Sequence, residues 1–145
     1  MYTGRFVIVN EQTVRVERSF LCSPSRLWKA ITDSAELSAW MHYPVSSDAV
    51  AGGRINFDFN KTGEDGCGGE ILTLDEPKLF EHEFVCGKDT TLPKSICRWE
   101  IKRSGKGSKI ILTHTHLRPD TVKGLGDGWS AFLDDLSKHL DQVTA

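Results

Sequence analysis

The 145-residue sequence contains no apolar run of about 20 residues, the length that a membrane-spanning helix requires. Its N-terminal residues lack the apolar length and the small-residue cleavage site of a secretory signal. It also lacks a basic block, since 18 Lys and Arg stand against 20 Asp and Glu, a formal net charge of −2. These absences predict a cytoplasmic protein without a membrane span that does not bind nucleic acid.

The cysteines form no C-x-x-C pair and have no spacing typical of a zinc site. They stand at Cys22, Cys67, Cys86 and Cys97. For a reducing compartment the sequence predicts four free thiols, mainly small buried side chains. Cys67 differs because it lies in a Gly-Cys-Gly sequence within an expected loop, so we expect its thiol to be exposed.

Common motifs of catalytic and cofactor sites are also missing. No G-x-G-x-x-G follows an expected strand, no G-x-S-x-G surrounds a serine, and residues 124–128 lack the Lys-Ser/Thr of a phosphate loop. The carboxylates are scattered, with no recognisable acid/base pair. His114 and His116 have the H-x-H spacing of two metal ligands, but a closed site needs a third and fourth ligand from elsewhere. We therefore predict no catalytic residue, no cofactor and no metal.

The C-terminal twenty residues predict one amphipathic helix, beginning near Trp129. Its large apolar residues recur at spacings of three and four and so share one stripe: Phe132, Leu133, Leu136, Leu140 and Val143. The glycine-rich residues 119–128 are expected to lead into this helix as a loop. A single long helix with one apolar stripe requires an apolar surface to cover, and a sheet is the natural candidate.

Two short helices are predicted near the N-terminus. Ser23 has the character of an N-cap, with Pro24 at the first helical position, where its missing N–H costs nothing. Asp33 with Glu36 three residues later resembles a capping box and predicts a second helix over residues 35–40.

Most of the remaining chain has the alternation of apolar and polar residues that is typical of strands. Residues 13–21 are the first expected strand, after an extended arm over residues 1–12. Residues 61–69 are an expected loop. Further strands are expected around Ile55–Phe59 and over residues 70–74, 79–86, 95–103 and 109–117. The order predicts one α+β domain over residues 1–145.

Two histidines stand on expected inward faces of these strands. His82 shares a face with Phe80 and Phe84, and His114 shares one with Leu112. Each is either a core histidine bonded to a polar neighbour or a polar anchor in an apolar pocket. A histidine in such a pocket could also exchange protons near neutral pH.

Several segments resemble one known family. They are residues 23–33, 37–40, 52–57, 69–80, 98–101, 110–117 and 128–140. Together they resemble the family named for the activator of heat shock protein 90 ATPase (Aha-type), in the START-like (SRPBCC, Bet v-like) superfamily. The resemblance covers about residues 13–143 and implies a helix-grip fold, in which a curved antiparallel sheet wraps around a long C-terminal helix with a hydrophobic cavity between them.

The resemblance also implies a function. The leading hypothesis is binding of a small apolar or aromatic molecule by a monomer or homodimer. The alternatives are a chaperone-accessory protein with a chaperone partner and an enzyme that uses a cavity histidine. His82 stands where family members more often carry an apolar residue, so it is the preferred polar anchor. The residues expected to line the cavity are Trp40, Phe57, Phe80, His82, Phe84, Trp99, Leu112, His114, Trp129, Phe132, Leu133 and Leu136.

Overall fold

The computed structural model describes residues 6–61, 66–86 and 94–144, with the backbone alone for residues 142–144. Positions 1–5 of the expected arm, 62–65 of the expected loop and the Val143 side chain lie outside the described residues. The elements in chain order are β1 (Phe6–Asn10), β2 (Thr13–Phe20), α1 (Pro24–Thr32), α2 (Ser34–Met41), β3 (Val45–Ser47), β4 (Arg54–Phe57), β5 (Cys67–Asp75), β6 (Leu79–Cys86), β7 (Ser95–Ser104), β8 (Gly107–Thr115), η1 (Pro119–Thr121) and α3 (Val122–Thr144).

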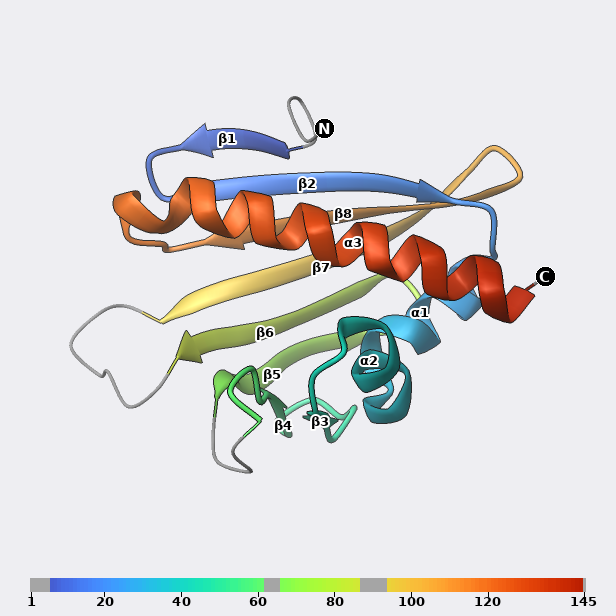
Figure 1. The fold of residues 1–145 in the computed structure, drawn as a ribbon, viewed down its shortest axis with the longest axis horizontal. Coiled ribbons are helices and arrows are strands. Elements are labelled where there is room, and N and C mark those ends of the chain that lie inside the picture. Colours follow the sequence, from blue (N-terminus) through green and yellow to red (C-terminus); the bar gives the residue numbers. More distant parts are fainter. Residues whose placement is uncertain (1–5, 62–65, 87–93, 145) are drawn as a thin grey trace.

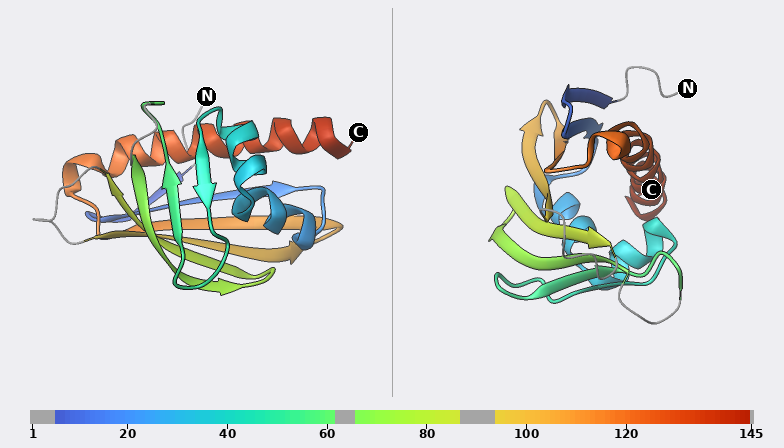
Figure 2. Two further views of the ribbon diagram at one scale, coloured as in Figure 1. Left: turned by 90° about the horizontal axis from the view of Figure 1, so that it is seen from below. Right: turned by 90° about the vertical axis from the view of Figure 1, so that its left-hand side faces the viewer.

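The strands form an eight-stranded antiparallel sheet in the order β1-β2-β8-β7-β6-β5-β4-β3. The sheet curls around α3, which runs along its concave side, and α1 and α2 lie at one end of the sheet beside the C-terminal half of α3 (Figures 1 and 2). The predicted fold class, an α+β helix-grip fold, is confirmed. Because β1 precedes β2, the two short helices follow the second strand and not the first.

Both predicted helix starts are confirmed. The Ser23 side chain caps α1 by accepting a hydrogen bond from the Arg26 N–H at 3.2 Å. The Asp33 side chain caps α2 by accepting one from the Glu36 N–H at 3.1 Å. These contacts are local in sequence, which is why the pattern alone could predict them.

The two sheet edges differ in how they are covered. At the outer edge of β3, Ser34 Oγ accepts a hydrogen bond from Ser47 N (2.8 Å) and donates one to Ser47 O (3.1 Å). Ser38 Oγ does the same for Val45 N and Val45 O, at 2.9 and 3.1 Å. The two serines are four residues apart on α2 and their partners are two residues apart on β3, so one turn of the helix follows the strand edge. At the opposite edge, β1 exposes about half of Val7, Ile8 and Val9.

The final helix is longer than predicted, because α3 begins at Val122 and includes Gly124, Gly126 and Gly128. The expectation of a loop over these residues is wrong. Each glycine lowers helix propensity by about 1 kcal/mol relative to Ala, but tertiary packing overrides this cost. A Cβ at Gly126 would stand 2.6 Å from the Phe6 ring, so the glycine lets β1 pack closely against the helix.

Side chains alternate in burial along the strands as predicted. Phe80, His82 and Phe84 on β6 are buried, while their neighbours on the strand are not fully buried. The matching inward faces of β7 and β8 carry Trp99 and His114. From the helix, Trp129, Leu133, Leu136 and Leu140 complete the core. The apolar stripe of α3 thus packs on the concave face of the sheet.

The cysteines depart from the prediction. Cys67 and Cys86 face each other across β5 and β6 and form a disulfide. The expectation of free thiols is wrong for this pair, and Cys67 begins a strand where a loop was expected. Cys22 and buried Cys97 are free, as predicted. The paired cysteines are separated by 19 residues and become neighbours only when the strands pair, which no spacing motif records.

Candidate functional site

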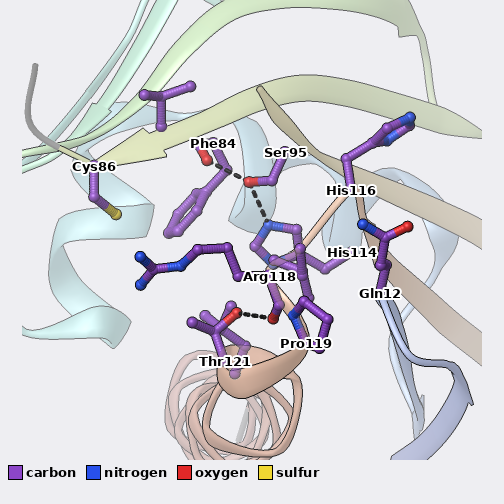
Figure 3. Close-up of a pocket in the computed structure, with 12 residues that line it drawn as sticks. Gln12, Phe84, Cys86, Ser95, His114, His116, Arg118, Pro119 and Thr121 are labelled. Atoms are coloured by element: carbon purple, nitrogen blue, oxygen red, sulfur yellow. Dashed lines mark hydrogen bonds between the residues drawn. The ribbon is translucent and has the colours of Figure 1, made fainter. Parts of the chain in front are cut away.

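A cavity of about 580 Å³ opens between the N-terminal end of α3 and the ends of β6 and β8 (Figure 3). Its lining surface is mostly apolar. Its volume lies within the range of small-molecule sites, about 300–1,000 Å³. The apolar residues of the lining are Phe84, Val85, Cys86, Leu117, Pro119 and Leu125, and the polar ones are Gln12, Ser95, His114, His116, Arg118 and Thr121.

A tight connection between β8 and α3 places the residues at the mouth of this cavity. His116 adopts a left-handed backbone (φ 62°), which turns the chain directly after the strand. Leu117 N then donates to Gln12 O at 3.0 Å. Arg118 O accepts two hydrogen bonds from Thr121, from its N–H at 2.9 Å and its hydroxyl at 2.7 Å. These bonds fix the η1 turn and with it the position of the Arg118 backbone.

His114 lies on the cavity wall, and both of its ring nitrogens are hydrogen-bonded. The indole N–H of Trp129 donates to His114 Nδ1 at 3.0 Å. His114 Nε2 lies 2.9 Å from Ser95 Oγ, and the Ser95 hydroxyl donates to Phe84 O. Since Nδ1 accepts, the neutral ring carries its proton on Nε2 and donates it to Ser95. A continuous chain of hydrogen bonds therefore links α3 to β8, β7 and β6.

His82 makes a similar arrangement deeper in the core. The indole N–H of Trp99 donates to His82 Nε2 at 3.1 Å. His82 Nδ1 lies 2.9 Å from the Glu83 carbonyl oxygen, which can only accept, so Nδ1 carries the proton. The ring is fully buried among Phe57, Phe80 and Phe84 side chains, at centroid distances of 5.1–6.5 Å. Both histidines are bonded to polar neighbours, as one of the two interpretations predicted.

Burial also decides the charge of these rings. It lowers the pKa of His82 to about 4, against a smaller opposing effect of the hydrogen bond to Glu83. Burial, with a smaller repulsion from His82, lowers the pKa of His114 to about 3. Both side chains are therefore neutral at pH 7. The expectation that they exchange protons near neutral pH is wrong, because the apolar surroundings disfavour the imidazolium form.

The predicted cavity residues divide between the cavity and the packed core. Phe84 and His114 line the cavity. Phe132 is partly buried against the core. Among the described residues, the others are buried in the core and do not border this cavity: Trp40, Phe57, Phe80, His82, Trp99, Leu112, Trp129, Leu133 and Leu136. That they contact a ligand stays a prediction.

The aromatic core nevertheless reaches the cavity wall. Phe84 contacts the rings of His114 and Trp129, at centroid distances of 5.0 and 5.6 Å. Trp129 in turn contacts Trp99 and Phe132, at 5.5 and 5.9 Å. Phe84 is thus the residue through which the predicted aromatic set meets the cavity.

The model of one protein family, described as activator of Hsp90 ATPase homolog 1-like protein (AHSA1), matches residues 21–141 of this chain. The chain belongs to the AHSA1 family. This confirms the resemblance found in the sequence. A comparison with curated protein sequences gives no match.

Solved structures share the fold of this AHSA1-family chain. A protein from Mesorhizobium loti is 23% identical, with a TM-score of 0.78 over 90% of this chain and 98% of that one. CalU16 from Micromonospora echinospora is 20% identical, with a TM-score of 0.76 over 88% and 75%. An Hsp90 activator from Plasmodium falciparum is 18% identical, with a TM-score of 0.76 over 90% and 96%. At these identities the similarity establishes the fold alone.

The described residues of this AHSA1-family chain do not form two other types of site. They contain no group of three or more His, Cys, Asp or Glu side chains arranged to hold a metal ion. His116 lies beyond the end of β8, so it does not share a strand face with His114 as the H-x-H spacing suggested. No helix in the described ranges is long and apolar enough to cross a membrane.

Most residues at the mouth of the cavity were not predicted from the sequence. Leu117, Arg118, Thr121 and Leu125 belong to the segment between the end of β8 and the first turn of α3, which was expected to be a strand end and a loop. One signal was available, since Pro119 between a strand and a helix is typical of the first turn of a helix. The close approach of Gln12 depends on the pairing of β2 with β8 and had no local signal.

Proposed function

We propose that this AHSA1-family protein binds a small apolar or aromatic molecule in the cavity beside the start of α3. The observation that carries the proposal is the cavity itself, about 580 Å³ with a mostly apolar lining, in a protein whose core is otherwise filled by large side chains. Transfer of apolar surface out of water contributes about 25 cal/mol per Å², so a ligand that fills this space is stabilised without a specific charge partner.

The polar groups of the inner wall favour an apolar ligand, because they are already hydrogen-bonded within the protein. His114 is neutral, and its two ring nitrogens already bond Trp129 and Ser95. The Ser95 hydroxyl donates to Phe84 O. A ligand that lies against these groups does not have to satisfy a strong donor or acceptor, which suits a hydrocarbon or aromatic surface. Phe84 and Leu125 would contact it from the sheet and from the helix.

A dye titration tests the proposal. N-phenyl-1-naphthylamine, a neutral aromatic dye, is expected to bind the protein with one site and a Kd of about 1–10 μM, a range typical of modest apolar burial. Replacing Leu125 by Trp should weaken binding at least about tenfold, because the larger side chain occupies the cavity. Leu125→Ala should retain binding, because it leaves the space open. Dye fluorescence and calorimetry measure both affinities.

Leu21→Trp is the matched control. Leu21 is 91% exposed just after β2, at the far end of that strand from Gln12, so the same substitution there should leave dye binding unchanged. Saturable binding that is equally strong in wild type and Leu125→Trp would place the dye elsewhere and contradict the proposal. Complete absence of dye binding to the wild-type protein would contradict it as well.

A chaperone-accessory role is the second candidate function, supported by AHSA1 membership and by the exposed apolar edge of β1. Val7, Ile8 and Val9 are exposed by 49%, 55% and 47% on a terminal strand, where backbone groups can pair with a partner. If the chain acts in this way, it should raise the ATPase rate of Hsp90 about twofold or more. Ile8→Lys should abolish the effect, and Leu72→Lys on β5 should not. An unchanged ATPase rate with the wild-type protein would rule out this function.

A further inference from the structure

We propose that the molecule held in the cavity is an apolar carboxylic acid, with its hydrocarbon part inside and its carboxylate at the mouth beside Arg118. This inference rests on the proposed function, since it names the chemical class of the ligand for the same cavity. The charge of the lining residues, and not their apolar character, distinguishes an acid from a neutral or basic molecule of the same shape.

The described part of the cavity lining carries charge of one sign, which is positive. The described residues that line the cavity include Arg118 and no Asp or Glu. Arg118 forms an ion pair with Asp120, in which Arg118 Nε and Asp120 Oδ1 are 3.7 Å apart. Both side chains are more than half exposed, so water and salt screen this pair and it holds the guanidinium weakly. The guanidinium can therefore bind a second carboxylate, for which its fork of donors is suited.

The interior of the cavity cannot hold the charged end of such a ligand. His114 is neutral, and its Nε2–H is already donated to Ser95. The Ser95 proton is donated in turn to Phe84 O. A carboxylate placed against this wall would lose its water without gaining a donor, which is strongly unfavourable. The ligand is therefore oriented with its charge toward the mouth and its apolar part toward Phe84 and Leu125.

The geometry of the mouth agrees with this orientation. In Figure 3 the Arg118 side chain extends from the turn before η1 toward the strand end at Cys86. Gln12 and His116 lie on the other side of the same view. The backbone carbonyl of Arg118 is held by the two hydrogen bonds from Thr121, so the point at which its side chain leaves the backbone is fixed beside the cavity. An amine in the same place would be repelled by Arg118 and would find no carboxylate among the described lining residues.

A competition experiment with three matched ligands tests the inference. Dodecanoate, 1-dodecanol and dodecylamine share one hydrocarbon chain and differ in the charge of the head group. Each is titrated against bound N-phenyl-1-naphthylamine at about 0.05 M salt, where screening is modest. We expect dodecanoate to displace the dye at about tenfold lower concentration than dodecanol, the effect of one charge-assisted contact. Dodecylamine should be the weakest competitor.

Variants of Arg118 assign the preference to this residue. Arg118→Gln should weaken dodecanoate about tenfold and leave dodecanol within about twofold. Arg118→Glu should reverse the order of acid and amine. Lys123→Gln is the matched control, because Lys123 is an exposed cation near the start of α3 that pairs with Asp127 and does not line the cavity. It removes the same charge and should leave all three affinities unchanged.

The outcomes separate this inference from the function on which it rests. Equal displacement by dodecanoate and dodecanol, or an acid preference that survives in Arg118→Gln, overturns the inference and leaves apolar binding standing. An acid preference that Lys123→Gln removes as fully as Arg118→Gln also overturns it, because net charge would then be the cause. If neither the dye nor any of the three ligands binds, the proposed function fails together with the inference.

Discussion

Lowering the pH from about 7.5 to about 4.5 should reduce the free energy of unfolding by about 5 kcal/mol through His82 and His114 alone. The folded-state pKa values of about 4 and about 3 lie below the value of about 6.5 expected in the unfolded chain. Below pH 6.5 the unfolded state therefore binds protons that the folded state excludes. The two histidines make their full contribution to stability above pH 6.5. This contribution decreases as the pH falls, and below pH 3 it does not change further.

Glu36 acts in the same direction at the acid end of this window. Burial alone would raise its pKa, but hydrogen bonds from His139 and Arg26 hold the pKa below its ordinary value. Its contribution is present above the unfolded pKa of about 4.3 and is lost as the pH falls through the lower folded value. The decline between pH 6.5 and pH 5 is therefore assigned to the histidines and the decline below pH 4.5 partly to Glu36.

Urea denaturation at several pH values measures this effect. His82→Gln and His114→Gln each remove one titrating group and should each reduce the loss between pH 7.5 and pH 4.5 by about half. Leu21→Gln is the control, because Leu21 is exposed just after β2 and carries no titratable group, so its replacement should leave the pH dependence unchanged. Wild-type and His114→Gln curves that run parallel would contradict burial of a neutral histidine at this position.

Replacing Trp129 by Ala should destabilise the protein by about 5 kcal/mol, at the upper end of the range for buried aromatic residues. Trp129 is 3% exposed and packs between Trp99 and Phe84, so its removal leaves a large cavity between α3 and the sheet. It also removes the donor to His114 Nδ1, which would leave a buried acceptor without a partner. Chemical denaturation monitored by far-UV circular dichroism measures the loss.

Trp129→Phe separates the hydrogen bond from the packing. It keeps most of the ring volume and should cost about 1–3 kcal/mol, the penalty of an unsatisfied buried nitrogen. Combining it with His114→Leu removes both partners of the hydrogen bond. The loss of stability in the double variant should therefore be smaller than the sum of the two single losses, by about 1 kcal/mol or more. Strict additivity would show that the Trp129–His114 bond does not contribute to stability.

The elements that could be predicted from the sequence depend on contacts between near neighbours. Ser23 and Asp33 cap their helices through hydrogen bonds to residues three positions later, so both caps could be recognised from the sequence. The inward faces of β6, β7 and β8 follow from a period of two, which is a local property of an extended backbone. The family resemblance added the curvature of the sheet and the place of the long helix.

The candidate site was harder to predict because its residues come from distant parts of the chain. Gln12, Ser95 and Arg118 meet only after β2, β7 and β8 have paired and α3 has packed across them. The start of α3 was predicted too late because of its glycines. Gly126 makes room for Phe6, a contact that helix propensity does not describe. The Cys67–Cys86 disulfide likewise depends on strand register.

Periodicity and short-range hydrogen bonding were sufficient to predict the α+β class, the capped helices and the buried faces of the strands, and the resemblance of several segments indicated the family. The folded structure was needed to show that His82 and His114 are neutral and bonded to tryptophans, that two cysteines pair, and that a cavity remains at the start of α3. The physical reason is that the pKa of a buried group, a disulfide and an empty volume are set by neighbours in space, which the order of residues along the chain does not specify.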